Sequence, residues 1–468
     1  MKTTKRISKL LLIPFLILGM VACDSYLEDE IISPNDPVEV TPQLLLTNVQ
    51  VATFASYAGQ LTRQSLVFAQ QLSGTAAGSQ SEEIAQYNIT EISNENEWEV
   101  IWAGAVVDCR NLIEDYGAEN PYYSGIAQVI MALNIGLATD LWGDVPFDQG
   151  GAGLDVPSLE PAFEEQEIVL EKLQVLLDQA INDLSAPSEA NAFFPGTDDL
   201  IFGGNVQNWI TTAWIIKARY ANRLSAIDPA GSASEVLSHL SNAGATGPAS
   251  DALMQFFGGN AANQWSQFEA SRQGYYRVSQ SFVELLVDND DPRTPFFLAV
   301  DTDGGYSGTP FDNTSNANSS YVGPYYSGPS QPVPLVTYVE SKFLEAEAQL
   351  RAGNPGLAAE AHNAAVIASI EQVTGESPTG EFVDTFASED GSGITLEKIM
   401  TQKYIALFIQ IEVYSDVRRT GIPELTPNPN ALIAGIPLRL PTPQSERLYN
   451  PNAIVVGNVL IPVWWDQN

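Results

Sequence analysis

The side chains that most often perform catalysis are scarce in this sequence. It contains two histidines, His239 and His362, and two cysteines, Cys23 and Cys109. A serine nucleophile needs a neighbouring general base, and two histidines far apart in the chain offer little support for one. The sequence has no glycine-rich phosphate loop, no His-Glu-x-x-His motif and no Gly-x-Ser-x-Gly elbow. We therefore predict a protein that is not an enzyme.

Carboxylates are abundant, and two kinds of site could use them. A glycosidase needs a pair of carboxyl groups, one of them with a raised pKa in an apolar setting, and no pair in the sequence stands in such a setting. A lipoprotein hydrolase nevertheless stays open as an alternative. The acidic groups at 288–291 and 301–303 could place oxygens around Ca²⁺, although neither fits the spacing of an EF-hand loop. We expect no cofactor and no metal, with calcium as the alternative.

Aromatic and amide side chains in long loops point to binding. Residues 243–276 and 300–336 are rich in Gly, Ser, Asn, Pro and aromatic residues, and residues 75–96 form a third, polar loop. Sugar rings stack on flat apolar faces, while amides and carboxylates take their hydroxyl groups. The candidate ligand-binding residues are Tyr87, Asn263, Gln264, Trp265, Tyr275, Tyr276, Tyr321 and Tyr325. For each of them, packing inside the protein is an equally good interpretation.

The charge of the chain narrows the class of partner. Lys and Arg number 21 against 57 Asp and Glu, which gives a net charge of −36. Because binding to nucleic acid requires clustered Lys and Arg, no nucleic-acid partner is expected. The same balance argues against adsorption on anionic lipid. Two cysteines cannot build a disulfide framework, and Cys109, inside a predicted helix, fits a buried apolar role.

The N-terminus has the features of an exported lipoprotein. Residues 1–22 combine four Lys and Arg with an apolar run and end in a small residue immediately before Cys23. This pattern resembles the bacterial lipobox, in which the cysteine becomes the lipidated first residue. Residues 23–42 then form the lipid anchor and a tether rich in Pro, Asn and Asp, with acidic residues close to the anchor. We expect a lipid-anchored protein exposed at the surface of the outer membrane.

A helical hairpin in the second half of the chain provides a scaffold for the loops. Val339, Phe343, Ala346 and Leu350 recur with helical spacing over residues 337–350. A Gly-Asn-Pro sequence at 353–355 ends this helix, and an alanine-rich helix follows. The length of the pair matches a tetratricopeptide-like unit, which must stack on neighbours to bury its apolar face. An ordinary helical hairpin of an all-α domain is the alternative.

Further helices are predicted on both sides of this hairpin. Their ranges are 44–71, 98–116, 121–141, 165–184, 206–227, 277–288 and 396–419, followed by an irregular, proline-rich tail over 423–468. The sequence thus predicts a mainly helical, all-α fold in one domain that spans residues 43–468, with long irregular loops forming the ligand face.

Several short motifs, taken together, resemble the SusD/RagB family of nutrient-binding outer-membrane lipoproteins. The matching stretches are 139–147, Gln166, 203–205 before Trp209, 291–293, 338–348, 402–404, 412–423, 436–439 and 463–466. Their order agrees with the family from the lipobox to the last residues. Tyr404 and Tyr414 are departures, because those positions often hold Trp. Most matched residues look structural, and we expect Arg418, Arg419 and Arg439 to bind carboxylates or loop carbonyls.

The resemblance implies a fold and a function. The fold would be helical, with tetratricopeptide-like hairpins and a loop-built ligand face. The protein would bind an oligosaccharide or polysaccharide and deliver it to a SusC-like, TonB-dependent β-barrel transporter, over which it sits as a lid. Two alternatives stay open: the same architecture with peptide or another nutrient as cargo, and a scaffold for surface assembly that binds only its neighbouring protein.

Overall fold

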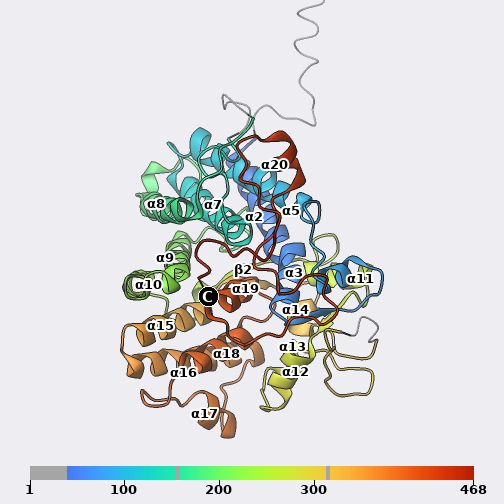
Figure 1. The fold of residues 1–468 in the computed structure, drawn as a ribbon. Coiled ribbons are helices and arrows are strands. Elements are labelled where there is room, and N and C mark those ends of the chain that lie inside the picture. Colours follow the sequence, from blue (N-terminus) through green and yellow to red (C-terminus); the bar gives the residue numbers. More distant parts are fainter. Residues whose placement is uncertain (1–39, 153–158, 313–316, 468) are drawn as a thin grey trace, which may run out of the picture.

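Three helical hairpins stack along one side of the molecule in a computed structural model that describes residues 40–152, 159–312 and 317–467 (Figure 1). The hairpins are α7 (Pro121–Trp142) with α8 (Gln166–Leu184), α9 (Val206–Arg223) with α10 (Pro229–Ala243), and α15 (Tyr338–Arg351) with α16 (Pro355–Thr374). Helix α8 also contacts α9, and α10 contacts α15, so the three pairs form one continuous stack. The predicted all-α fold with tetratricopeptide-like hairpins is confirmed.

The third hairpin shows how the sequence sets this arrangement. Thr337 caps α15, its side chain accepting a hydrogen bond from the Glu340 backbone N–H at 3.2 Å. The apolar positions Val339, Phe343 and Ala346 are buried, as their spacing predicts. Gly353 then takes a positive φ of 78°, a conformation that glycine adopts without strain, and α16 begins two residues later.

The remaining helices lie beside this stack (Figure 1). They are α2 (Pro42–Ala58), α3 (Gln60–Phe68), α4 (Gln80–Ala85), α5 (Glu95–Glu99), α6 (Val107–Asn111), α11 (Gln264–Ser271), α12 (Gln280–Val287), α13 (Thr294–Phe297), α14 (Pro324–Ser327), α17 (Glu381–Phe386), α18 (Leu396–Ala406), α19 (Glu412–Thr420) and α20 (Gln444–Tyr449). Two π-helical segments, Val100–Val106 and Leu112–Tyr116, flank α6, and 3₁₀ turns cover Ser188–Ala190, Leu224–Ala226 and Pro248–Ser250.

The structure departs from the predicted helices in four places. The helix expected over 44–71 breaks at Gly59, where a Cβ would lie 2.0 Å from the Ala55 carbonyl oxygen, so the close approach needs glycine. The helix expected over 98–116 contains the two π segments, and the one expected over 396–419 is interrupted between α18 and α19. Helices α10 and α11 were not predicted, because Gly, Ser and Asn weaken the helical signal of α10 and α11 has only 8 residues.

Two small antiparallel sheets tie the segment between α10 and α15 to the rest of the molecule. Strand β1 (Leu72–Gly74) pairs with β3 (Tyr276–Val278), with Ser73 opposite Arg277. Strand β2 (Ala252–Met254) pairs with β4 (Val333–Val336), immediately before α15. The segment therefore leaves the helical stack after α10, meets the region after α3, and returns to the stack at α15.

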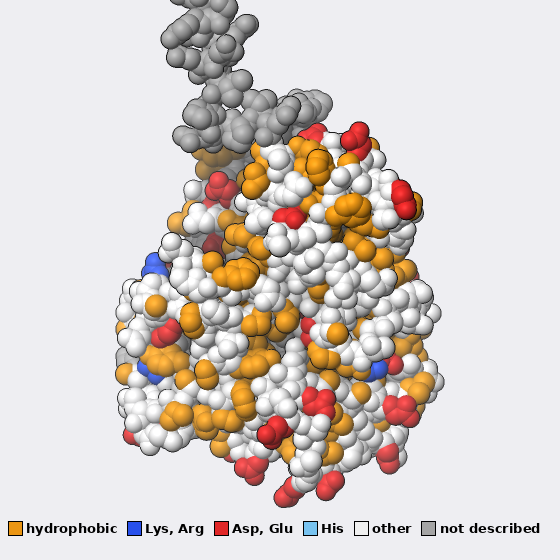
Figure 2. Space-filling view, turned by 180° about the vertical axis from the view of Figure 1, so that it is seen from behind, with side chains coloured by type: hydrophobic (Ala, Val, Ile, Leu, Met, Phe, Trp, Pro, Cys, Tyr) orange, Lys and Arg blue, Asp and Glu red, His pale blue; other side chains and the backbone are white. Residues whose placement is uncertain are grey.

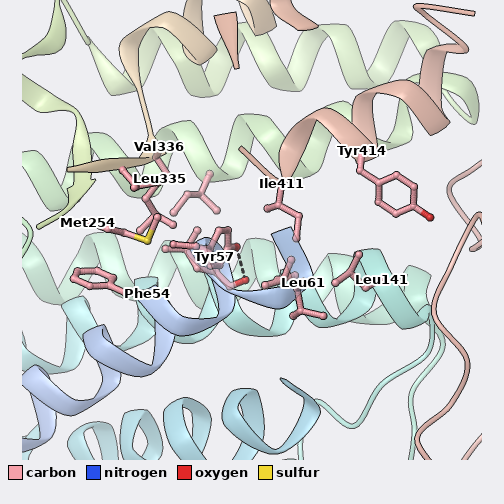
Figure 3. Packing of buried hydrophobic residues seen from close by; sticks show 14 of the residues in the cluster. Phe54, Tyr57, Leu61, Leu141, Met254, Leu335, Val336, Ile411 and Tyr414 are labelled. Atoms are coloured by element: carbon pink, nitrogen blue, oxygen red, sulfur yellow. Dashed lines mark hydrogen bonds between the residues drawn. The ribbon is translucent and has the colours of Figure 1, made fainter. Parts of the chain in front are cut away.

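The main hydrophobic core joins the N-terminal helices to this segment. Phe54 and Tyr57 of α2 lie close to Met254 of β2 and Leu335 of β4 (Figure 3). Helix α7 is the one described helix that is long and apolar enough to cross a membrane, and the whole of its apolar stretch is buried inside the protein. Helix α7 is therefore the central helix of the core.

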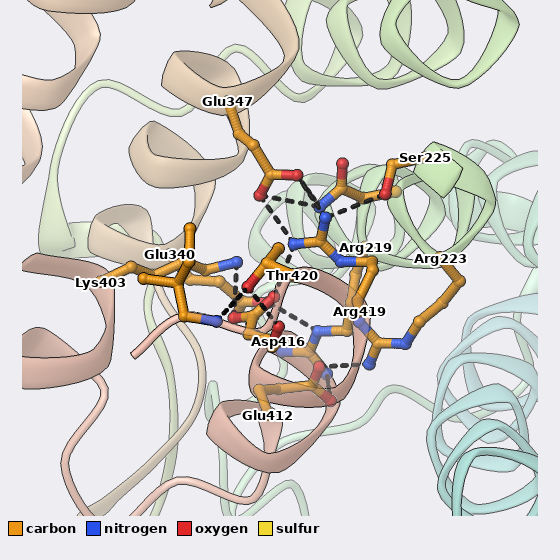
Figure 4. A network of polar contacts seen from close by, with 12 residues as sticks. Arg219, Arg223, Ser225, Glu340, Glu347, Lys403, Glu412, Asp416, Arg419 and Thr420 are labelled. Carbon is orange, nitrogen blue, oxygen red and sulfur yellow. Dashed lines mark hydrogen bonds and ion pairs between the residues drawn. The ribbon is translucent and has the colours of Figure 1, made fainter. Parts of the chain in front are cut away.

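A buried ionic network, which we call the ionic hub, connects five helices (Figure 4). It contains five cationic side chains and five carboxylates: Arg219, Arg223, Arg351, Lys403, Arg419, Asp140, Glu340, Glu347, Glu412 and Asp416. These residues come from α7, α9, α15, α18 and α19, and include several of the motif residues noted in the sequence. The opposite charges balance, which is the condition for burying ions without a large free-energy penalty.

The geometry of the hub is specific. Arg219 binds Glu340 through two bonds of 2.7 Å, and Arg223 binds Asp140 and Glu412. Burial alone would raise the pKa of Glu412, but the charges of Arg219 and Arg223 outweigh that effect and hold the pKa well below its usual range. The C-terminal Trp465 joins the hub by donating to Asp140 at 2.9 Å.

The predicted structural roles of three arginines near this hub are confirmed. Arg418 donates to the carbonyls of Asp140 and Leu438, Arg419 binds Glu347 and Asp416, and Arg439 donates to the carbonyl of Trp142. The family motifs thus mark the scaffold, and the ligand face has to be sought elsewhere.

Candidate binding site

An aromatic cleft opens between α11, β3 and the loop before α14. Its volume is about 460 Å³, within the range of small-ligand sites. The residues that line it are Trp265, Ser266, Phe268, Glu269, Ala270, Gln273, Tyr276, Ala299, Tyr321, Val322 and Ser327. All of them belong to the segment between α10 and α15, so the predicted location of the ligand face in these loops coincides with a cleft.

Asn263 fixes the helix that carries the aromatic side chains. Its side-chain oxygen caps α11 by accepting from the Trp265 backbone N–H at 2.8 Å. Its amide nitrogen donates to the carbonyls of Tyr326 and Gln331, each at 2.8 Å. Because one side chain bonds both the start of α11 and the loop around α14, the two walls of the cleft are held together.

Phe268 forms the centre of an aromatic cluster in the cleft. The guanidinium carbon of Arg63, from α3, lies 4.0 Å from the centroid of its ring. The rings of Tyr275 and Tyr276 pack against Phe268 with centroid distances of 6.0 and 5.5 Å. Burial lowers the pKa of Arg63 to about 10, which still leaves it charged at neutral pH.

Tyr321 lines the cleft opposite α11. Arg277 stacks on its ring, with the guanidinium carbon 3.8 Å from the centroid, and donates to its hydroxyl at 2.6 Å. Burial raises the pKa of Tyr321, so the hydroxyl keeps its proton at neutral pH and can donate to a ligand. Aromatic faces are thus present on two walls.

Two polar groups complete the cleft. Burial raises the pKa of Glu269, although its carboxylate accepts from the Gly274 backbone N–H at 3.2 Å. The indole N–H of Trp265 is buried and has no hydrogen-bond partner among the described residues. A carboxyl group, a phenol and an indole among aromatic rings are the groups that bind sugar hydroxyls and stack on sugar rings.

Five of the eight predicted residues lie at or beside the cleft. Trp265, Tyr276 and Tyr321 line it. Gln264 is the first residue of α11 and half-buried, and Tyr275 is half-buried against Phe268. Trp265 and Tyr276 are largely buried, so much of each ring packs the protein while part of it forms the cleft wall.

The other three residues are placed away from a ligand surface. Tyr87 is buried, its ring packs on Phe68 and its hydroxyl accepts from the Asn428 backbone N–H at 3.3 Å. Asn263 is fully buried by its capping bonds. Tyr325 donates to the Gln372 carbonyl of α16 at 3.2 Å. For these three, the structure shows packing, which the sequence could not separate from ligand contact because both use the same residue types.

Phe268, Glu269 and Arg63 were not among the ligand-binding residues predicted from the sequence. The signal for the first two was present, since Asn263 is a helix-capping residue and Trp265 and Phe268 are three residues apart, on one face of a helix. Arg63 lies in a distant helix, and its contact with Phe268 depends on the tertiary fold. Long-range contacts of this kind carry no local signal.

The acidic groups considered for calcium have protein partners. Asp291 binds Arg293 through a bond of 2.6 Å, and Asp301 accepts from the Gly305 backbone and the Ser307 hydroxyl. Among the described residues, no group of three or more His, Cys, Asp or Glu side chains could hold a metal ion. Calcium binding stays an untested alternative.

Of the two cysteines, the structure describes Cys109. Cys109 is fully buried, and burial raises the pKa of its thiol far above the usual value, as expected for an inert apolar side chain. Cys23, the predicted lipid anchor, lies outside the described residues, as do residues 1–22 and most of the tether.

Comparisons with solved structures support the helical architecture. A chitin-binding protein aligns with a TM-score of 0.74 and 23% identity over 92% of this chain and 100% of its own. A chitin-binding SusD homologue from Flavobacterium johnsoniae aligns with a TM-score of 0.78 and 20% identity over 90% of this chain and 99% of its own. A SusD/RagB family protein from Bacteroides thetaiotaomicron aligns with a TM-score of 0.74 and 22% identity over 92% of this chain and 99% of its own. At these identities the likeness establishes the fold.

The family assignment comes from the sequence. No curated protein matches the chain. A family model described as "Starch-binding associating with outer membrane" matches residues 34–443, which is most of the sequence. Together with the motifs and the fold, this match shows that the chain belongs to the SusD-like family of starch-binding, outer-membrane-associated proteins.

Proposed function

We propose that this protein is a non-enzymatic, cell-surface lipoprotein that binds a neutral oligosaccharide or polysaccharide in the aromatic cleft. The observation that carries the proposal is the presence of Phe268, Glu269 and Tyr321 in the lining of one cleft, the first two from α11 and Tyr321 from the loop before α14. The starch-binding description of the family and the chitin-binding activity named for two structural relatives support a glycan ligand.

The charge of the protein favours an uncharged glycan. Acidic side chains are scattered over the face shown in Figure 2, where few Lys or Arg side chains appear. Glu269 lies in the cleft itself, and the two nearby guanidinium groups are engaged by Phe268 and Tyr321. A uronic acid or sulfated sugar would meet like charges, whereas glucose and N-acetylglucosamine polymers would not.

Delivery to a transporter forms the second part of the proposal. The lipobox-like sequence at Cys23 and the family's association with the outer membrane support anchoring at that membrane. A protein that captures nutrients there needs a route inward, and a SusC-like, TonB-dependent barrel would provide it. Ligand transfer requires reversible binding, which fits an open cleft in which rings stack on a few aromatic faces.

Affinity electrophoresis tests the proposed function. The soluble protein, residues 24–468, would be run through gels that contain amylopectin, glycol chitin or polygalacturonate. We expect retardation by a neutral glycan, no retardation by polygalacturonate, and no shorter products after prolonged incubation. Release of products would indicate a hydrolase, and no retardation by any glycan would favour peptide cargo or a scaffold role.

A further inference from the structure

A second pocket, distinct from the aromatic cleft, lies between α3, α4 and α5. We call it the polar pocket. Its volume is about 400 Å³, and its lining is dominated by amide, hydroxyl and carboxylate side chains with three isoleucines. The residues are Gln60, Gln64, Gln80, Glu83, Ile84, Asn88, Ile89, Thr90, Ile92, Ser93, Glu95, Asn96 and Glu97. No residue of the aromatic cleft is among them.

Gln64 is the residue in this pocket that the fold does not explain. Its side chain is 1% exposed, and neither its amide nitrogen nor its amide oxygen has a hydrogen-bond partner among the described residues. Its neighbour one turn earlier, Gln60, is satisfied, because it donates to the Ser93 carbonyl at 3.1 Å and accepts from Gln80 at 3.2 Å. Since a buried unpaired amide destabilises a protein, retention of Gln64 calls for a partner outside the chain.

Asn94 repeats this pattern directly behind the pocket wall. It occupies the cap position of α5, but its side chain makes no capping bond. Both atoms of its amide are buried without a partner among the described residues, while the flanking Ser93 and Glu95 line the pocket. Gln64 therefore lines the pocket with a donor and an acceptor unpaired, while Asn94, which does not line it, lies next to two residues that do.

The surrounding charges define what can bind here. Glu83, Glu95 and Glu97 line the pocket, and Glu95 is already occupied by the Ser445 backbone N–H and hydroxyl at 2.9 and 2.7 Å. An anionic ligand would be repelled. Each hydroxyl group of a sugar is both donor and acceptor, which matches amides that have both functions free. Ile92, 63% exposed, adds an apolar surface for the C–H face of a ring.

We propose that the polar pocket binds an uncharged pyranose unit, with Gln64 as its hydrogen-bonding group, and selects against anionic sugars. The inference rests on the glycan-binding function proposed above and adds a second subsite to it. Gln64 reaches the ligand hydroxyls by a rotation of its side chain, because its amide atoms are shielded from solvent in the present conformation.

Arg63 places the polar pocket beside the aromatic cleft. It precedes Gln64 in α3, and its guanidinium stacks on Phe268 of the cleft. The same charge acts on Glu97 of the polar pocket, whose pKa is raised by burial and lowered by Arg63. One glycan chain could therefore occupy both sites, with its interior on the aromatic rings and one unit in the polar pocket.

Calorimetric titration with maltohexaose, chitohexaose and hexagalacturonate tests this inference. The variant Gln64→Leu keeps the size of the side chain and removes both amide atoms. We expect it to weaken binding of the neutral hexasaccharide about tenfold, the effect of losing one to two hydrogen bonds. The matched control is Gln50→Leu, since Gln50 is equally buried but bonds the carbonyls of Leu46 and Asp198 at 2.9 and 3.0 Å.

Thermal unfolding separates a binding role from a structural one. Replacing an unpartnered amide by an apolar side chain should raise the melting temperature of Gln64→Leu slightly, whereas Gln50→Leu should lower it and leave glycan binding unchanged.

The polar-pocket proposal would be overturned if Gln64→Leu bound the neutral hexasaccharide as tightly as the unmodified protein does. It would also be overturned if the unmodified protein bound hexagalacturonate as tightly as the neutral hexasaccharide. Either result would leave glycan binding in the cleft intact. If Phe268→Ala loses glycan binding while Gln64→Leu keeps it, the polar-pocket proposal would likewise be overturned and glycan binding in the cleft would stand. No binding of any hexasaccharide by the unmodified protein would overturn both proposals.

Discussion

Buried polar side chains in this protein fall into two regions that differ in how their bonds are satisfied. In the ionic hub, Arg219, Arg223 and Arg419 each bind carboxylates and the charges balance, although Arg219 Nη1 and Arg419 Nε have no hydrogen-bond partner among the described residues. We use the name loop face for the aromatic cleft and the polar pocket together. There, the side chains of Gln64, Asn94 and Trp265 have donors or acceptors without partners among the described residues. A scaffold minimises its free energy by pairing such groups, while a binding surface leaves them for its ligand. The comparison contrasts side chains that are paired within the fold with side chains whose polar atoms we propose for ligand binding.

The largest expected effect lies in the hub. Arg219→Met would remove the guanidinium that binds Glu340 and Glu412, leaving buried carboxylates without their partner. We expect the free energy of unfolding to fall by about 3–5 kcal/mol, as for other broken buried ion pairs. Urea denaturation would measure this loss. A change below about 1 kcal/mol would remove the distinction between the hub and an ordinary surface ion pair.

Acid should weaken the hub through its carboxylates. Burial alone would raise the pKa of Glu347 and Glu412, but the neighbouring cations hold both well below the unfolded value of 4.5. Between the folded-state pKa values and 4.5, the unfolded chain binds more protons than the folded chain. The stabilisation that these carboxylates provide is therefore fully present above pH 4.5 and is lost as the pH falls toward the folded-state values. Urea denaturation over acidic pH would measure this loss.

Asp251 acts in the opposite direction at higher pH. Burial raises its pKa from 3.8 to about 7, although the Tyr338 backbone N–H and the Gln372 amide donate to it. The folded state therefore binds the extra proton between these values, and its contribution to stability decreases as the pH rises from 3.8 to 7. The urea midpoint should thus be highest near pH 4–5, and Asp251→Asn should flatten the decline toward neutral pH. A midpoint that rises steadily to pH 8 would contradict both assignments.

A smaller effect is expected on the loop face, and on binding instead of stability. Phe268→Ala removes a half-buried ring from the cleft and should weaken glycan binding about tenfold, or ~1.4 kcal/mol. Phe257→Ala is the matched control, because Phe257 is 69% exposed and does not line the cleft. Calorimetry gives the affinities, and circular dichroism confirms that both variants fold. Equal affinities for the two variants would show that the cleft is not the site.

The smallest effect belongs to a partly exposed ion pair. Lys342 and Glu345 lie three residues apart on α15, with side chains 22% and 31% exposed. Lys342→Ala should change the free energy of unfolding by no more than about 0.5 kcal/mol. This pair calibrates the hub by urea denaturation, and a loss as large as that in Arg219→Met would mean that burial does not decide the strength of these pairs.

The scaffold was predictable from the sequence because its signals are local. The apolar spacing of α15, the Gly-Asn-Pro stop before α16 and the arginines of α19 all appear within short stretches, and the structure confirms each of them. The family motifs coincide with the hub, because a buried ion pair requires particular side chains at particular positions.

The aromatic cleft lies in loops that the sequence singled out, but its lining was not predictable in detail. The aromatic loops indicated a site, yet Tyr87 and Asn263 have the same composition signal as Tyr321 and serve packing instead. The contact of Arg63 with Phe268 and the unpaired state of Gln64 depend on segments far apart in the chain. Such relations exist only in three dimensions, so no local pattern could show them.

The most direct test of glycan binding in the aromatic cleft is a crystal structure of the protein soaked with the neutral oligosaccharide that retards it in gels. We predict a sugar ring stacked against Phe268 or Tyr321, with a hydroxyl group within hydrogen-bond distance of Glu269. A ligand bound on another face, with the aromatic cleft unchanged, would contradict this account.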